Sequence, residues 1–251
     1  MRAAGRIVSV VLAELGRAAQ PGVSTLDLDR LAFEIIKDHG GSPSFLGHRH
    51  GSAVYEHSIC ASVNREVVHG IPRADRILEN GDILSIDVGV KLKGFHGDSA
   101  VTVPIGEISQ TARDLLRVTH ESLWHGIRAI RKNGRIQDIS RAVQRHVESR
   151  GYSVVRSLCG HGIGRDIWEA PEVPNYVEAG RGNIAFHEGL VIAIEPMINT
   201  GGYDVRVLPD KWTIVTEDGG LSAHFEHTVA ITPNGYEVLT LGPHEPTDPG
   251  V

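Results

Sequence analysis

The spacing of apolar residues predicts four helices, arranged along the chain as two pairs. In each segment apolar side chains recur every three or four residues, which places them on one face of a helix. Glycine, proline and asparagine residues interrupt the pattern between the segments, as expected at helix boundaries. The predicted helices are 2–18, 25–39, 109–132 and 136–150, with Thr25 as the expected N-cap of the second.

Between the two helix pairs, residues 82–104 predict a β-hairpin. Strand-forming residues stand on both sides of a polar turn at 91–94. If Leu92 and Lys93 form the two-residue loop, Asp87 lies directly opposite Asp98. Like charges in that arrangement destabilise a strand pair, and a shared divalent cation would offset the repulsion. The alternative is a register shifted by one residue, which turns one of the carboxylates toward water.

Other segments predict short strands, and two of these carry a carboxylate. Segment 190–198 is apolar on both faces except at Glu195, and segment 222–231 contains Glu226. The sequence CGHGIGR at 159–165 predicts a glycine-rich turn that exposes His161. We exclude a phosphate-binding loop, because the motif lacks the Lys-Ser/Thr ending and no ribose-binding acid follows on a βαβ unit. The predicted strands are 59–63, 152–158, 190–198, 212–216 and 222–231.

The order of predicted elements repeats. Segments 22–40 and 134–151 both run from a glycine through an Asp-Leu or Asp-Ile pair and a helix to a closing glycine. We therefore predict one α+β domain over 1–241, with two pseudo-twofold-related halves at about 1–105 and 106–241, and a disordered tail over 242–251. Chance similarity between two ordinary helices is the alternative.

Composition narrows the class of protein. The chain of 251 residues is 41% hydrophobic and 22% charged, which is typical of a soluble globular protein. The formal net charge of -6 argues against a broad nucleic-acid interface. No apolar run is long enough to span a membrane, and no signal peptide precedes the first helix. Cys60 and Cys159 give no disulfide framework, which favours a reducing cytoplasm.

Glu195 is the strongest single indication of a site. A carboxylate in a strand that is apolar on both faces needs either a salt bridge or a metal ion. With Asp87, Asp98, His161 and Glu226 it makes a set of oxygen ligands and one imidazole, which suits Mn²⁺, Fe²⁺ or Co²⁺ better than structural zinc. Four carboxylates carry more negative charge than one divalent ion balances. We therefore expect two ions, which would activate water for hydrolysis.

Five motifs resemble those of methionine aminopeptidase type I. Each is weak alone, but their collinear order from about residue 1 to 240 is specific. The resemblance implies the pita-bread fold, an antiparallel sheet with helices on one face, and its two related halves agree with the duplication above. The motifs are HGIP at 69–72, IDVGV and GFHGDSA within 86–100, CGHGIGR at 159–165, IEPM at 194–197 and EHT at 226–228.

The resemblance also implies how the metal ligands divide. Asp87 would chelate one ion, and His161 with Glu195 would hold the other. Asp98 and Glu226 would bridge the two ions. Glu195 would in addition act as the general base.

The implied substrate contacts include one departure from the family. His69 would contact the substrate near the scissile amide, and Cys60 and Trp212 would line the methionine pocket. The family usually has Phe-His after GHGIGR, with that histidine polarising the scissile carbonyl; here these positions are Ile167 and Trp168. An indole N–H donates one hydrogen bond but does not carry charge or move a proton.

A second departure is the loop at 47–58, which is some four residues longer than the family's and would lie at the pocket mouth. It contains His48, His50 and His57. Metal binding and plain solvation both remain open for these three side chains.

Together these features predict a cytoplasmic, dinuclear metallo-aminopeptidase that removes N-terminal methionine from peptides and nascent proteins. We expect a monomer whose partner is a peptide N-terminus, with no specific nucleic acid and no membrane. One alternative is a hydrolase of the same fold with another N-terminal residue specificity, of the Xaa-Pro type or for specialised metabolism. Another is a non-catalytic binding protein on the same scaffold, and the retention of all five ligands counts against it.

Overall fold

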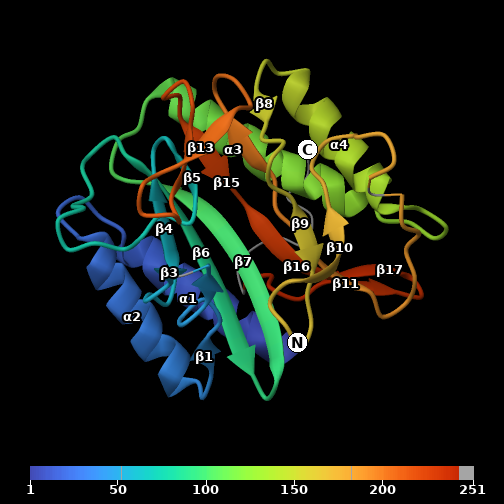
Figure 1. Ribbon diagram of the computed structural model, residues 1–251, viewed down its shortest axis with the longest axis horizontal. Helices are drawn as coiled ribbons and strands as arrows, with labels where there is room; N and C mark the ends of the chain where they lie inside the picture. Colours follow the sequence, from blue (N-terminus) through green and yellow to red (C-terminus); the bar gives the residue numbers. More distant parts are fainter. Residues whose placement is uncertain (52, 182, 243–251) are drawn as a thin grey trace.

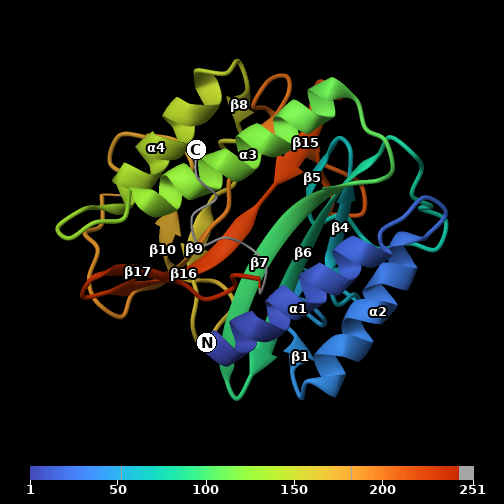
Figure 2. The same cartoon turned by 180° about the vertical axis from the view of Figure 1, so that it is seen from behind.

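The structure is a computed structural model that describes residues 1–51, 53–181 and 183–242. Its helices lie on one face of a curved antiparallel sheet, as Figures 1 and 2 show from opposite sides. The described helices are α1 (Arg2–Ala18), α2 (Thr25–Asp38), α3 (Gln110–Arg128) and α4 (Ile136–Glu148). The described strands are β1 (Ser42–Pro43), β2 (Arg49–His50), β3 (Ala53–Val54), β4 (Cys60–Val63), β5 (Glu66–Val68), β6 (Ile83–Leu92), β7 (Phe95–Pro104), β8 (Ser153–Val154), β9 (Gly160–Gly162), β10 (Glu169–Val173), β11 (Val191–Ile194), β12 (Met197–Asn199), β13 (Val205–Val207), β14 (Ile214–Thr216), β15 (Ser222–His224), β16 (Glu226–Thr232) and β17 (Gly235–Val238).

One nine-stranded sheet joins the two parts of the chain. Its order is β1-β6-β7-β16-β11-β9-β10, with β4 beside β6 and β17 beside β16. The contact between β7 and β16, where Glu226 lies opposite Ala100, connects the first half of the chain to the second. Smaller sheets, β15-β12-β8 and β13-β14-β5, extend this arrangement, and β2 pairs with β3.

Each helix pair covers its own hydrophobic core. Buried residues of α1 and α2, such as Val11 and Leu28, pack on Leu84 and Ile86 of β6. Residues of α3 and α4 pack in the same way on β11 and β16. Burial of these apolar faces is the main term that holds the helices to the sheet. The proposed half boundaries remain a prediction, and residues 243–251 of the predicted tail lie outside the described residues.

The hairpin register differs from the sequence prediction by two residues. Asp87 lies opposite Ala100 and Asp98 lies opposite Gly89, so the predicted Asp87–Asp98 pair is wrong. The loop is Lys93-Gly94, with φ of 50° and 81°, because a tight two-residue hairpin favours left-handed conformations at both positions. Side chains alternate with period two, so a shift of two residues keeps both aspartates on one face.

The predicted helices are present, with corrections at their ends. Ser24 rather than Thr25 is the N-cap of α2, since its Oγ accepts a hydrogen bond from the Asp27 N–H at 3.1 Å. The Thr25 side chain instead bonds the backbone of Arg73. The third and fourth helices end at Arg128 and Glu148, earlier than predicted.

Two long predicted strands are interrupted. Segment 190–198 divides into β11 and β12 at Glu195-Pro196, and segment 222–231 divides into β15 and β16 at Phe225. Proline has no N–H to continue the ladder, which accounts for the first break. Only Ser153–Val154 of segment 152–158 forms a strand, and Ile214–Thr216 of segment 212–216. No described helix has the length and hydropathy needed to cross a membrane.

Candidate metal centre and substrate cleft

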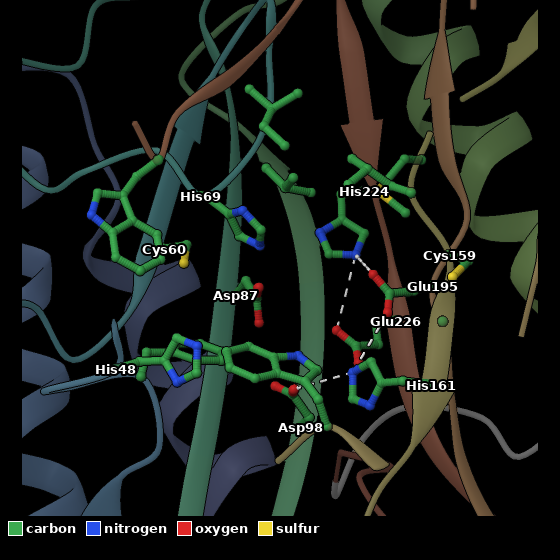
Figure 3. Close-up of a pocket in the computed structure, with 18 of the residues that line it drawn as sticks. His48, Cys60, His69, Asp87, Asp98, Cys159, His161, Glu195, His224 and Glu226 are labelled. Carbon is green, nitrogen blue, oxygen red and sulfur yellow. Dashed lines mark ion pairs between the residues drawn. The ribbon is translucent and has the colours of Figure 1, made fainter. Parts of the chain in front are cut away.

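A cavity of about 580 Å³ lies between the two halves of the chain (Figure 3). Every site residue predicted from the sequence lines it, although these residues come from nine different strands and connections. They are Cys60, His69, Asp87, Asp98, His161, Trp168, Glu195, Trp212 and Glu226.

Two strand pairs each bring two carboxylates to the cavity. Asp87 and Asp98 are diagonal neighbours on β6 and β7. In the second pair, Ile194 lies opposite His227 and Met197 lies opposite His224, so the register is continuous across the break. Glu195 therefore stands directly opposite Glu226. The like-charge pair that was expected between Asp87 and Asp98 is thus formed by Glu195 and Glu226.

His161 reaches the carboxylates from β9. Its Nε2 lies 3.9 Å from Asp98 Oδ2 and 3.6 Å from Glu195 Oε1. Its Nδ1 lies 2.8 Å from the carbonyl oxygen of Gly162, so a neutral ring donates there and turns the Nε2 lone pair toward the acids. A backbone partner on the outer nitrogen is typical of metal-binding histidines.

The predicted turn at 159–165 is wrong over Gly160–Gly162, because these residues form β9. A Cβ on Gly162 would lie 2.2 Å from the carbonyl oxygen of Ala170, so glycine allows β10 to pack closely there. Gly160 and Gly162 thus serve strand packing beside the site rather than a turn.

The electrostatics of the cluster are those of a site that needs cations. Burial, with repulsion between the acids, raises the pKa of Asp87, Glu195 and Glu226 well above the ordinary range. Burial raises the pKa of Asp98 to about 7 and lowers the pKa of His161 to about 4. The cluster thus disfavours the charged forms of its acids unless a positive charge compensates.

Unpartnered oxygens test whether metal ions fit. Asp87 Oδ1, Asp98 Oδ1 and Glu226 Oε1 are buried and have no hydrogen-bond partner within the described residues. Ligand atoms of Asp98, His161 and Glu226 lie within 4.8 Å of one another. In the part of the chain that the structure describes, Glu195 pairs with histidines and with no lysine or arginine. The residues therefore fit divalent cations, and the salt-bridge alternative for Glu195 finds no support.

Cys60 and aromatic side chains form part of the cavity lining. Cys60 lies opposite Asp87 on the neighbouring strand, so its buried side chain adjoins the acids. The rings of Tyr55 and Trp212 are 5.2 Å apart, and Tyr55 donates a hydrogen bond to the Ile59 carbonyl oxygen at 2.9 Å. Both cysteines of the chain are free. Tyr55 is a lining residue that the sequence did not reveal, since its place depends on the loop before β4.

His69 enters the cavity from a strained backbone position. Its φ is 58°, in the left-handed region that a histidine seldom adopts. The following Gly70 allows the approach of Ala61, because a Cβ there would lie 2.4 Å from the Ala61 carbonyl oxygen. Figure 3 shows His69 facing His224 across the cavity.

Trp168 and the lengthened loop meet at the cavity mouth. The Trp168 ring lies 4.3 Å from His48, 6.3 Å from Phe45 and 6.4 Å from His161, and the residue is 41% exposed. The loop therefore brings the imidazole of His48 against the indole of Trp168. His57 instead lies 3.2 Å from Asp29.

No metal-binding group that includes these loop histidines is present among the described residues. The side chain of His50 lies outside the described part of the structure.

His224 is a cavity residue that sequence reasoning missed. It is 2% exposed, and its Nε2 lies 3.8 Å from Glu195 Oε2 and 3.9 Å from Glu226 Oε2. Burial lowers the pKa of His224 to about 3. Its position two residues before Glu226 would place it on the same strand face, but the intervening break obscured that signal.

Comparison with known proteins identifies relatives along almost the whole chain. The model of metallopeptidase family M24 matches residues 1–233. A methionine aminopeptidase of Clostridium acetobutylicum is 51% identical over 241 residues, covering 96% of this chain and 94% of the relative. That of Escherichia coli is 41% identical over 242 residues, covering 96% and 90%.

Solved structures agree with this result. A methionine aminopeptidase from Thermotoga maritima has a TM-score of 0.90 at 42% identity, covering 96% of this chain and 94% of that one. An Xaa-Pro dipeptidase from Bacillus anthracis has a TM-score of 0.77 at 20% identity, and this chain covers 60% of it. At that identity the comparison shows a shared fold only. The expected pita-bread fold is thus confirmed. The chain belongs to metallopeptidase family M24 and, within it, to the methionine aminopeptidases.

Proposed function

We propose that this chain is a dinuclear metal-dependent aminopeptidase that removes the N-terminal methionine from peptides and nascent proteins. The observation that carries the proposal is the carboxylate and histidine cluster in a cavity that is also lined by aromatic side chains. The names of the close relatives support the same activity.

The ligands would divide as the family resemblance implies. Asp87 would hold one ion, His161 and Glu195 the other, and Asp98 and Glu226 would be shared. The unpartnered carboxylate oxygens and the Nε2 lone pair of His161 support this division. Oxygen ligands with one imidazole suit Mn²⁺, Fe²⁺ or Co²⁺. When bound, such ions supply Lewis acidity and positive charge for amide hydrolysis.

The chain's own residues would orient the substrate and move its protons. Glu195 would be the general base, since its half-buried carboxylate lines the cavity. His69 would bind the substrate near the scissile amide. Cys60 and Trp212 would accept the methionine side chain, whose thioether packs well against aromatic rings.

We propose further that the protein acts as a monomer in the cytoplasm, without nucleic acid or membrane. The formal net charge of -6 supports the absence of nucleic-acid binding.

The contact between Trp168 and His48 favours a second candidate, the same chemistry with another N-terminal residue specificity. An indole at the cavity mouth changes its width, and the loop histidine changes its polarity. This candidate keeps the metal ligands and the general base unchanged.

Digestion of a peptide library, scored by the released residue, separates the candidates. The protein would be loaded with Mn²⁺ or Co²⁺. Release of methionine from Met-Ala-Ser peptides supports the first proposal, and preferential release of another residue supports the second. No release from any peptide would end both. Elemental analysis would then identify a non-catalytic scaffold by the absence of stoichiometric metal.

A further inference from the structure

His224 is a buried imidazole in the cavity that the proposed ligand division does not use. Its backbone is fixed, because the His224 N–H donates to Thr102 Oγ1 at 2.9 Å and the Thr102 hydroxyl donates to the His224 carbonyl oxygen at 2.8 Å. Ser85 Oγ lies 2.8 Å from the same hydroxyl oxygen and must donate to it, since the Thr102 hydrogen is already engaged. This buried network fixes the backbone from which the ring projects into the cavity.

Glu195 lies between two imidazoles. Its Oε1 is 3.6 Å from His161 Nε2, and its Oε2 is 3.8 Å from His224 Nε2. Figure 3 shows both rings directed at the acidic cluster from different strands. Each oxygen of the carboxylate thus has its own imidazole neighbour.

The two imidazoles differ in their outer contacts. His161 Nδ1 faces the carbonyl oxygen of Gly162, which leaves the Nε2 lone pair for a metal ion. His224 Nε2 faces two carboxylates, of Glu195 and Glu226, and has no hydrogen-bond partner within the described residues. A nitrogen that faces two acceptors is best occupied by a hydrogen, so the favoured tautomer makes His224 a donor.

We propose that His224 is a positioning residue whose Nε2–H donates to Glu195 Oε2 and thereby keeps Oε1 turned toward His161. The present separation of 3.8 Å is too long for a hydrogen bond, and a side-chain adjustment of about 1 Å closes it. The inference rests on the proposed function, because it concerns the orientation of the proposed base. The competing role is a sixth metal ligand, in which Nε2 carries a lone pair instead of a hydrogen.

Two substitutions separate these roles. His224→Gln keeps a donor, since the amide nitrogen of glutamine lies as many bonds from Cα as Nε2 of histidine does. His224→Leu keeps the volume and removes the donor. His227→Gln is the matched control, since His227 is equally buried but its ring lies 5.7 Å from that of Trp124 on the helix side.

Kinetics on a Met-Ala-Ser peptide with saturating Mn²⁺ give the first readout. Loss of a partner that orients a ligand typically costs about 10–100-fold, so we expect that decrease in kcat for His224→Leu, with KM within about threefold. We expect His224→Gln and His227→Gln to stay within about threefold of the wild type in kcat. Wild-type kcat in His224→Leu, or an equal loss in His224→Gln, would overturn the proposal.

Two readouts do not depend on activity. Calorimetric titration of the metal-free protein with Mn²⁺ should show two ions bound by His224→Gln with affinities within about tenfold of the wild type. The second readout is the NMR spectrum of the Zn²⁺-loaded protein with ¹⁵N-labelled histidine, compared between the wild type and His224→Gln. The Nε2 resonance that is missing from the variant should have the chemical shift of a protonated nitrogen. A metal-bound nitrogen shift there would establish the ligand role instead. An inactive wild type would refute the proposed function, while these two measurements would still decide the role of His224.

Discussion

Replacing Asp98 by Asn should stabilise the metal-free protein and remove much of its response to metal. Asp98 is 3% exposed, and its Oδ1 has no hydrogen-bond partner within the described residues. The substitution keeps the shape of the side chain and removes one charge from a cluster of four acids, of which Asp98 and Glu226 are buried. It therefore separates the cost of assembling the cluster from the benefit of binding a cation.

The magnitude for the metal-free state follows from charge repulsion. Two carboxylates about 6 Å apart repel by about 3 kcal/mol at an effective dielectric constant of about 20. Proton uptake relieves part of this repulsion, because burial raises the pKa of Asp98 to about 7. We expect Asp98→Asn to add about 1–2 kcal/mol to the free energy of unfolding without metal. At about 2–4 °C per kcal/mol for a chain of this size, Tm rises by roughly 2–8 °C.

Metal reverses the order of stability. An ion at a free concentration of 1,000 times its Kd adds about 4.1 kcal/mol to the wild type, or roughly 8–16 °C in Tm. The variant has lost a ligand proposed to be shared by both ions, so its shift should be less than about half as large. Wild type should thus be less stable than the variant in EDTA and more stable in Mn²⁺.

Thermal unfolding in EDTA and at two Mn²⁺ concentrations measures both effects. Asp29→Asn is the control, because Asp29 is also buried but its Oδ1 accepts hydrogen bonds from the N–H groups of Ser58 and Ile59 at 2.7 and 3.1 Å. That variant should lower Tm in both conditions and keep the full metal shift. An undiminished Mn²⁺ shift in Asp98→Asn, or a lower Tm in EDTA, would refute the reasoning.

Three further predictions address the base, the cavity mouth and the helix pair. Glu195→Ala should fold and lose at least about 10³-fold in kcat on methionyl peptides, and near-normal turnover would exclude Glu195 as the base. Trp168→His should raise kcat/KM on a Met-Ala peptide by up to about 10²-fold, since a missing donor to an oxyanion costs that much or more; an unchanged rate would shift attention to His48. His146 has its pKa lowered to about 4 by burial, with help from His125, so it binds its proton more weakly when folded than when unfolded. The contribution of His146 to the free energy of unfolding should therefore fall as pH drops from about 6.5 to 4, and His146→Leu should remove about 2 kcal/mol of pH dependence relative to the wild type in urea titrations.

The sequence was sufficient wherever a short-range rule decides the structure. All four helices follow the apolar spacing, and α1 has the predicted bounds. The hairpin prediction had the wrong loop, yet Asp87 and Asp98 still share a face, because the strand period of two tolerates an even error. A slip of one residue would have separated them.

Contacts between segments that are distant in the sequence could not be predicted from local patterns. Nothing local in the sequence indicates that Tyr55 or Phe45 lines the cavity, since both depend on how the loop before β4 crosses the mouth. The position of His224 in the cavity was not predicted for a different reason. It belongs to β15, whereas Glu226 begins β16, and the alternation of strand faces was not followed across the break.

The interruption that misled the strand prediction also explains how the second pair of acids is held. Pro196 removes a donor from the ladder, and the Phe225 N–H reaches its carbonyl oxygen at 3.4 Å, so the two strands separate locally while their register continues. Glu195 and Glu226 can then face each other without a tight ladder between them. Because β16 also pairs with β7 beside Asp98, two acidic strand pairs meet edge to edge. A cluster assembled in this way opposes the stability of its own sheet, and cations binding between the pairs would convert that repulsion into affinity.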